Sequence, residues 1–231
     1  FEEGVLKRDF LDLVRRFSFG NVTIVRVHYA LYEPPRFRNG ADMDKTPFQR
    51  IFGTVADIDR QYHEMAACIE PSDPFLWTAC WTLMDPTRAP PGKHTLIMDT
   101  FVSIDRSDGA NWEDRGPAYA RGALLGQLRN YTTNMGNDNI IAEYVETGPS
   151  LARANLCFHR GSTTGGERTL AQTGAFRPFP NCSNYRGPLK RLYLTGPSCH
   201  PGGGICGMGT MTAREILLDL GLRGEDDDLD L

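Results

Sequence analysis

The segment from Leu192 to Gly209 constrains the fold more than any other part of the chain. Its apolar start predicts a buried strand over residues 191–195, and the glycines that follow predict a turn over residues 196–209. Helical spacing then predicts a helix that ends at Gly221 and turns four side chains inward: Ala213, Ile216, Leu217 and Leu220. A strand, a glycine-rich turn and a helix in this order can bring backbone N–H groups against an anion.

Residues 202–207 also match the GxGxxG pattern of dinucleotide-binding folds, but their context does not suit that role. Only residues 208–231 follow, which leaves no room for a second strand and a ribose-binding acid about 20 residues further on. The same geometry suits a flavin better. A helix that starts near Gly207–Gly209 would stabilise the negative charge that a reduced flavin carries at its N1/C2 edge.

Charge and composition exclude several classes of protein. The 231 residues have a formal net charge of −4, and five of the 29 acids lie in the last seven residues, which leaves 25 basic against 24 acidic residues elsewhere. We therefore expect no nucleic-acid partner. No apolar run approaches the roughly 18 residues of a membrane helix, and no secretory signal is visible. We expect a cytoplasmic protein, or one bound peripherally to a membrane.

The six cysteines are scattered along the chain. They form neither a CxxC pair nor the regular spacing of metal ligands. In a chain of this length, that distribution favours reduced thiols over a disulfide framework. We expect no metal site.

Periodicity predicts the other elements. Helices are expected over residues 7–17, from a capping box at residues 54–57 to about residue 69, and over residues 116–135. Strands are expected over residues 22–32, 75–84, 94–104 and 139–146, and a loop over residues 33–47. Residues 158–190 show no periodicity, and a loop of that length inside a compact domain is usually functional.

Four stretches together resemble the phytoene desaturase-like FAD enzymes. This family includes bacterial carotenoid desaturases, carotenoid isomerases and pyridine nucleotide-disulfide oxidoreductase domain proteins. Leu192–Gly209 resembles the C-terminal flavin-binding motif of the family. The other similar stretches are residues 9–20, 85–94 and 176–180, so that the resemblance extends over about residues 7–220.

The resemblance implies a mixed α/β (α+β) fold that corresponds to half of a family member. Members are about twice as long and begin with a βαβ unit that binds the ADP half of FAD. This chain resembles the C-terminal part of the FAD/NAD(P)-binding Rossmann-like flavoprotein fold, with an antiparallel substrate-domain sheet. Residues 1–157 would form the substrate-domain portion, residues 158–221 the loop with the last strand and helix of the FAD-binding domain, and residues 222–231 a disordered acidic tail.

The missing half implies a partner. A second chain that carries the N-terminal dinucleotide-binding half would complete the fold, and this chain would be either a separate subunit or a cleaved fragment. Without such a partner, the apolar faces of residues 192–194 and 216–220 would stay bare, and exposed patches of that kind are rare in monomers.

The resemblance also assigns a cofactor, FAD, and residues that would contact it. The ribityl and pyrophosphate region would lie along Gly196, Pro197 and Ser198. The isoalloxazine edge would be lined by Gly204, Ile205, Cys206, Gly207 and Met208. Related flavoproteins often have an acid where this chain has Pro197–Ser198, which leaves backbone contacts to the ribityl chain.

The catalytic residue is unknown from the sequence, with His200 and His159 as candidates. His200 adjoins the proposed flavin edge, where it either donates a proton or fixes the turn through a backbone hydrogen bond. His159 lies in the loop and is a candidate to face the cavity. Cys199 and Cys206 flank the glycines, either as a redox pair or as small packing residues.

Two pairs of side chains are candidates for substrate contact. Trp77 and Trp81, expected on one strand face, either line a pocket for an apolar substrate or pack in the core. Arg26 and His28 lie on the opposite strand face from Val25, where they either approach a site or face solvent.

The leading hypothesis is a subunit of a two-chain FAD-dependent dehydrogenase or desaturase. It would oxidise an apolar small molecule, of terpenoid, carotenoid-like or alicyclic type, by hydride transfer to flavin N5. A non-catalytic scaffolding subunit of such an enzyme and a flavin-dependent isomerase are the alternatives.

Overall fold

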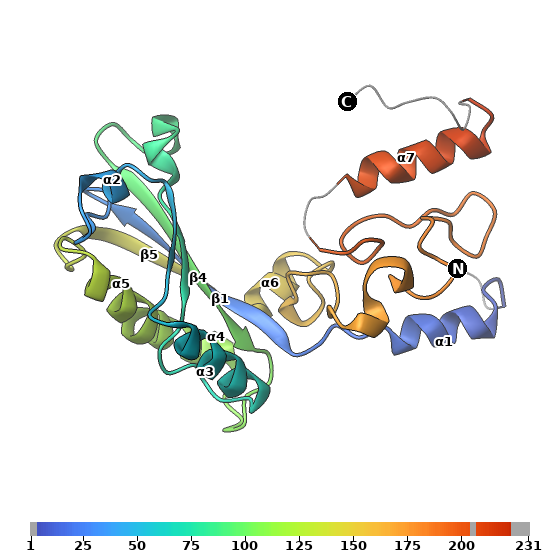
Figure 1. Ribbon diagram of the computed structural model, residues 1–231, viewed down its shortest axis with the longest axis horizontal. Helices are drawn as coiled ribbons and strands as arrows, with labels where there is room; N and C mark the ends of the chain where they lie inside the picture. The colour runs from blue at the N-terminus through green and yellow to red at the C-terminus, as the bar shows by residue number, and fades with distance from the viewer. Residues whose placement is uncertain (1–3, 204–206, 223–231) are drawn as a thin grey trace. The chain divides into compact units, whose positions relative to one another are not determined.

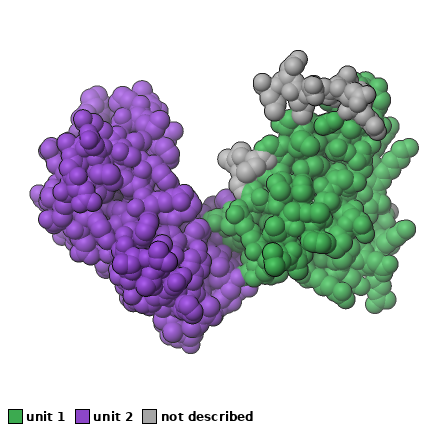
Figure 2. All heavy atoms as spheres, viewed as in Figure 1, with its two compact units in different colours: residues 1–20, 162–231 green, residues 21–161 purple. Residues whose placement is uncertain are grey.

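A computed structural model describes residues 4–203 and 207–222. The described residues form two compact units (Figure 2). Unit 1 combines residues up to Gly20 with those from Ser162 onward, and unit 2 comprises Asn21–Gly161.

Unit 2 is built on one five-stranded antiparallel sheet. Its strands are β1 (Val22–Leu31), β2 (Phe48–Ile51), β3 (Leu76–Ala79), β4 (His94–Ser103) and β5 (Ile140–Glu146). They lie in the order β2-β3-β4-β1-β5, so the long strands β1 and β4 are neighbours inside the sheet (Figure 1). Unit 2 thus confirms the predicted mixed α/β class and the antiparallel sheet.

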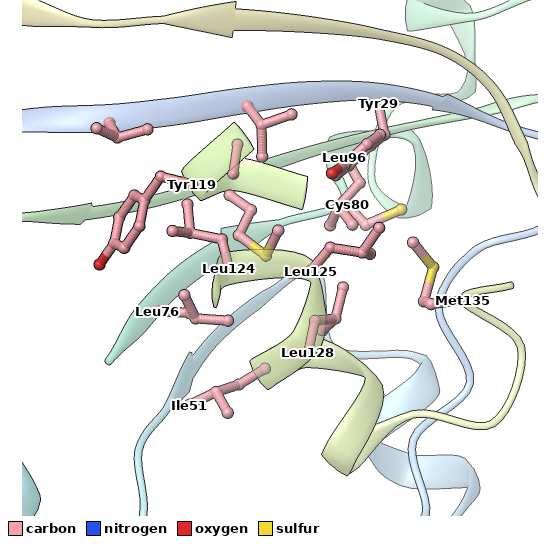
Figure 3. Close-up of a cluster of buried hydrophobic side chains, with 14 of the residues drawn as sticks. Tyr29, Ile51, Leu76, Cys80, Leu96, Tyr119, Leu124, Leu125, Leu128 and Met135 are labelled. Atoms are coloured by element: carbon pink, nitrogen blue, oxygen red, sulfur yellow. The ribbon is translucent and has the colours of Figure 1, made fainter. Parts of the chain in front are cut away.

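One face of the sheet packs against helices. Alternate residues of β1 from Val25 to Leu31 point to this face and are buried, as their period of two predicts. They meet α4 (Trp112–Tyr119), a π-helical turn (Ala120–Leu124) and α5 (Leu125–Tyr131) in the main core (Figure 3). The indole of Trp112 is buried there and donates a 2.6 Å hydrogen bond to the carbonyl of Ser103.

Helix α3 (Val55–Ala66) begins where its capping box predicts. The side chain of Thr54 accepts from the N–H of Asp57, and the carboxylate of Asp57 accepts from the N–H of Thr54. The helix is tied to the sheet by Gln61, whose buried amide bonds Thr100 at 3.0 Å and the carbonyl of Phe101 at 2.9 Å.

Three predicted elements of unit 2 differ in extent. The helix expected over residues 116–135 starts at Trp112, where Asn111 caps it by accepting from the N–H of Asp114, and it ends at Tyr131. The strand expected over residues 75–84 ends at Ala79. The loop expected over residues 33–47 contains a short helix α2 (Ala41–Asp44), and β2 was not predicted. The last α-helix of this unit is α6 (Gly148–Ala154).

Unit 1 contains two longer helices, α1 (Arg8–Arg16) and α7 (Met208–Asp219), with irregular chain between Ser162 and Gly203. The irregular chain includes short 3-10 turns at Leu170–Gln172 and Gly174–Phe176. The N-terminal segment packs on this part of the chain: the N–H of Ser18 donates to the side chain of Gln172 at 2.9 Å, and Phe10 meets Phe179 edge to face. It is therefore unit 1, not unit 2, that contains residues 4–20.

The strand expected over residues 191–195 is not formed. Tyr193 makes an isolated bridge to Arg186, and Leu192 and Leu194 are half-buried. A strand needs a neighbouring strand to pair its N–H and C=O groups, and unit 1 has none among its described residues. The inward face expected for the last helix is also incomplete, since Ala213 and Leu220 are exposed.

Candidate functional site

The glycine-rich turn is anchored to the long loop of the same unit. The hydroxyl of Ser198 donates a 2.7 Å hydrogen bond to the carbonyl of Gly165, and the N–H of Cys199 closes a tight turn on the carbonyl of Gly196 at 2.9 Å. Gly196 has a φ of +102°, a value that favours glycine. Gly196, Pro197 and Ser198 therefore lie in one hydrogen-bonded turn. Gly204, Ile205 and Cys206 lie outside the described residues.

A buried arginine holds this turn against the loop. Arg177 has an exposed fraction of 0%. Its guanidinium donates to six backbone carbonyls, at distances of 2.9–3.4 Å: those of Thr164, Gly165, Gly166, Glu167, Gln172 and Pro197. These bonds satisfy a side chain that would otherwise be very costly to bury. Burial in turn lowers the pKa of Arg177 from its ordinary value, and the nearby charge of Arg168 lowers it further.

Helix α7 begins at the end of the turn, as predicted. Gly207 precedes it with a left-handed φ of +37°, and no side chain caps the helix there. The first N–H groups of a helix have no partner within the helix, so they are available to a ligand. Among the described residues, no heavy atom lies within 4 Å of where a Cβ on Gly207 or Gly209 would stand. Met208 itself is buried beside the turn.

His200 belongs to a small buried cluster of the turn. The Tyr185 hydroxyl donates to the carbonyl of His200 at 3.1 Å, and the two rings meet edge to face. The Nδ1 atom of His200 is buried and has no hydrogen-bond partner among the described residues. Cys199 packs in the same cluster with Tyr185 and Met208, and burial raises the pKa of its thiol to about 11. A thiol with that pKa is a poor nucleophile at neutral pH.

The other histidine candidate, His159, lies in a short 3-10 turn (His159–Gly161) of unit 2. The two candidates therefore belong to different units, and the structure does not show them as one site.

The two tryptophans do not share a strand face. Trp77 lies on β3, but Trp81 follows the strand in a 3-10 turn (Trp81–Leu83), so the expectation of a common face was wrong. The strand ends because the chain folds into this turn, in which the N–H of Leu83 donates to the carbonyl of Cys80 and the N–H of Met84 to that of Trp81.

Trp77 instead belongs to a row of side chains that crosses the sheet on the face opposite the main core. The register aligns five residues, one from each strand, in the order Arg50, Trp77, Asp99, Arg26 and Glu146. Arg50 stacks on the Trp77 ring at 4.3 Å, and Arg26 bonds Asp99 at 2.7 Å. Burial raises the pKa of Asp99, an effect that the charge of Arg26 opposes.

A groove of about 500 Å³ lies on this same face. Its lining includes Trp81, Tyr144, Ile97 and His28, whose Nε2 lies 2.8 Å from a carboxylate oxygen of Glu146. His28 therefore borders a concave surface with aromatic walls, whereas Arg26 is not among the residues that line it and pairs with Asp99 instead.

Sequence reasoning missed Arg177 as a site residue. The segment 176–180 contributed to the resemblance, but a single arginine before a proline carries no signal of burial. The partners of Arg177 come from residues 164–197, and only the folded loop brings their carbonyls together.

Metal ligands do not cluster in the described part of the chain. No group of three or more potential ligands gathers among residues 4–203 and 207–222. Within the same residues, no helix combines the length and apolarity needed to cross a membrane.

Comparison with known proteins shows what the chain is similar to. No family model matches the chain. Homologues named as oxidoreductases nevertheless match it over most of its length at modest identity, which confirms the resemblance to phytoene desaturase-like proteins.

Three relatives illustrate this. A limonene dehydrogenase subunit of Castellaniella defragrans is 28% identical over 92% of this chain and 40% of its own length. Phytoene desaturase (lycopene-forming) of a Paracoccus strain is 32% identical over 87% of this chain and 38% of its own length. Pyridine nucleotide-disulfide oxidoreductase domain-containing protein 2 of the mouse is 29% identical over 58% of this chain and 23% of its own length. The chain thus spans about two fifths of the first two relatives.

Proposed function

We propose that the chain is part of an FAD-dependent oxidoreductase of the dehydrogenase or desaturase type, and that it supplies the residues that border the isoalloxazine edge of the flavin. The observation that carries the proposal is the anchored glycine turn of unit 1, which precedes a helix N-terminus at Gly207–Met208 that no described side chain caps. The names of the relatives support the reaction class, since they denote a dehydrogenase, a desaturase and an oxidoreductase.

The residues present fit a flat cofactor that becomes negatively charged. Three glycines of the turn, Gly196, Gly207 and Gly209, have no described heavy atom within 4 Å of a Cβ position, so a ring system can approach their backbone. The N-terminal amides of α7 and the positive end of its dipole would stabilise an anion. When bound, FAD would supply the hydride acceptor for the substrate.

The chain's own residues would then have separate roles. Gly196, Pro197 and Ser198 would lie along the ribityl and pyrophosphate through their backbone, because the Ser198 hydroxyl already donates to the carbonyl of Gly165. Met208, together with Gly204 to Gly207, would border the isoalloxazine. His200 would stay a candidate proton donor through its Nδ1, which has no partner among the described residues. Trp77 and Trp81 would contact an apolar substrate; of the two, Trp81 lines the groove of unit 2, and Trp77 stacks with Arg50 on the same face of the sheet.

We further propose that a second polypeptide carries the half that binds the ADP portion of FAD. The support is the name of one relative, which denotes one subunit of its enzyme. The substrate would be an apolar small molecule of terpenoid, carotenoid-like or alicyclic type, in keeping with the names of the relatives.

Substitution at the helix start tests the proposal. Gly209→Trp places a large side chain at the first turn of α7, where a Cβ meets no described atom, so the fold should tolerate it. We expect the purified complex to lose bound flavin, measured by its visible absorbance after denaturation. Gly122→Trp is the matched control, because Gly122 is also helical with free space around it but lies in unit 2. Equal flavin content in both variants and the wild type would contradict the proposal.

A further inference from the structure

Two arginines of unit 1 lie against the glycine turn. A Cβ on Gly202 would stand 2.6 Å from Cδ and 2.7 Å from Nε of Arg177. A Cβ on Gly203 would collide with the guanidinium of Arg168. Both glycines have positive φ values, +98° and +79°. The turn therefore takes a conformation that favours glycine, and the backbone of Gly202 and Gly203 lies close to the guanidinium groups of Arg177 and Arg168.

The positive charge here has no described acid to balance it. Among the described residues, neither Arg168 nor Arg177 forms an ion pair. The adjacent acid, Glu167, accepts a 2.7 Å hydrogen bond from the hydroxyl of Ser18. The charged neighbour that acts on Arg177 is Arg168, since the nearby thiol of Cys199 is uncharged at neutral pH. Two like charges close together without a counter-ion repel each other, and an anion would relieve that repulsion.

The two arginines differ in what they can do. Arg177 is completely buried and has its N–H groups committed to carbonyls, so it can act only as a fixed charge and as a support for the turn. Arg168 is exposed, and no bond from its guanidinium to a described residue competes with a ligand. Arg168 can therefore donate directly to an anion, in the forked geometry that suits phosphate and carboxylate oxygens.

We propose that Arg168, backed by the buried charge of Arg177 and by the bare backbone of Gly202–Gly203, forms an anion-binding site at the glycine turn. Within the proposed function, on which this part rests, the anion is supplied by FAD. It is either the diphosphate of the dinucleotide or the isoalloxazine in its anionic reduced form. Arg168 is the contact residue, and Arg177 is a positioning residue.

Two measurements on the full chain in its complex test the site. The first is the affinity for inorganic pyrophosphate, by calorimetry on flavin-depleted protein. The second is the midpoint potential of the bound flavin. Arg168→Gln removes one charged donor, so we expect either an affinity for pyrophosphate that is about tenfold lower or more, or a clear fall in the midpoint potential. Arg16→Gln is the control, because Arg16 is an exposed arginine of the same unit on α1.

The pattern of results identifies the anion. A loss of pyrophosphate affinity alone assigns the site to the diphosphate, and a lower midpoint potential alone assigns it to the reduced isoalloxazine. If Arg168→Gln leaves both quantities equal to those of Arg16→Gln, the anion site is disproved while the bound flavin still supports the proposed function. If the wild-type complex holds no flavin but its pyrophosphate affinity depends on Arg168, the proposed function fails and the anion site stands.

Discussion

At the scale of single residues, Arg177 organises the candidate site. A guanidinium offers five N–H donors in a fixed plane, and here they serve six carbonyls from two stretches of loop and from the glycine turn. The sequence could not predict this role, since an arginine is among the residues least often buried. The glycines at 202 and 203, by contrast, could be interpreted as a close backbone approach from the sequence, although what they approach could not.

A conservative substitution should show how much the loop depends on this arginine. Arg177→Lys keeps the charge but has only three donors on one nitrogen, so it leaves buried carbonyls of the loop without partners. We expect the free energy of unfolding to fall by about 3 kcal/mol or more, measured by urea denaturation. Arg16→Lys, on the exposed side of α1, should stay within about 0.5 kcal/mol of the wild type. Equal stability of the two variants would contradict the role assigned to Arg177.

At the scale of elements, the sequence predicted those helices and strands that are specified by a pattern within their own residues. Strand β1 has alternating apolar residues, and α3 has its capping box, so both were found near their observed bounds. Residues 191–195 look equally like a strand, yet they have no described neighbour to pair with. The strand from residue 75 was predicted too long because the alternating residues 75–83 carry no signal for the 3-10 turn that begins at Trp81. Pairing and termination depend on distant residues.

Elements are also joined by charge, and Glu70 gives the clearest case. Glu70 follows α3. Its carboxylate accepts a 2.7 Å hydrogen bond from Arg106, which follows β4, and two hydrogen bonds of 2.7 and 2.8 Å from Arg115, which lies on α4. Burial raises the pKa of Glu70, but the bonds from the two arginines outweigh it, so that the pKa lies below its ordinary value. A carboxyl with a lowered pKa in the folded state stabilises the fold above its ordinary pKa, and this contribution is lost as the pH falls through the folded value.

Glu70→Gln should therefore destabilise the protein in a pH-dependent way. We expect a lower free energy of unfolding than the wild type at pH 7 and a smaller difference at about pH 3, measured by urea denaturation at both values. Glu33→Gln is the control, because Glu33 pairs with Arg36 on the exposed surface, where an ion pair contributes little. A loss of stability for Glu70→Gln that is the same at both pH values would be inconsistent with this role.

At the scale of the whole molecule, the two units carry different kinds of surface. Unit 1 offers an anchored glycine turn, an uncapped helix start and two arginines that form no ion pair with a described residue. Unit 2 offers a sheet whose second face combines aromatic side chains with a charged row and a groove. The glycines and the resemblance predicted the turn and the helix start of the first surface, but neither of its arginines. The tryptophans of the second surface were assigned to a single strand, which the structure corrected. The charged row depends on the pairing register of all five strands, which periodicity does not specify.

The central claim is that this chain completes a flavoenzyme together with a second polypeptide. The most direct test is to purify the chain from its native source under non-denaturing conditions and to record both the visible absorbance spectrum and the polypeptides present. We predict one bound flavin for each copy of this chain and a second polypeptide in fixed proportion. A colourless chain that purifies alone and stays in solution would contradict the claim.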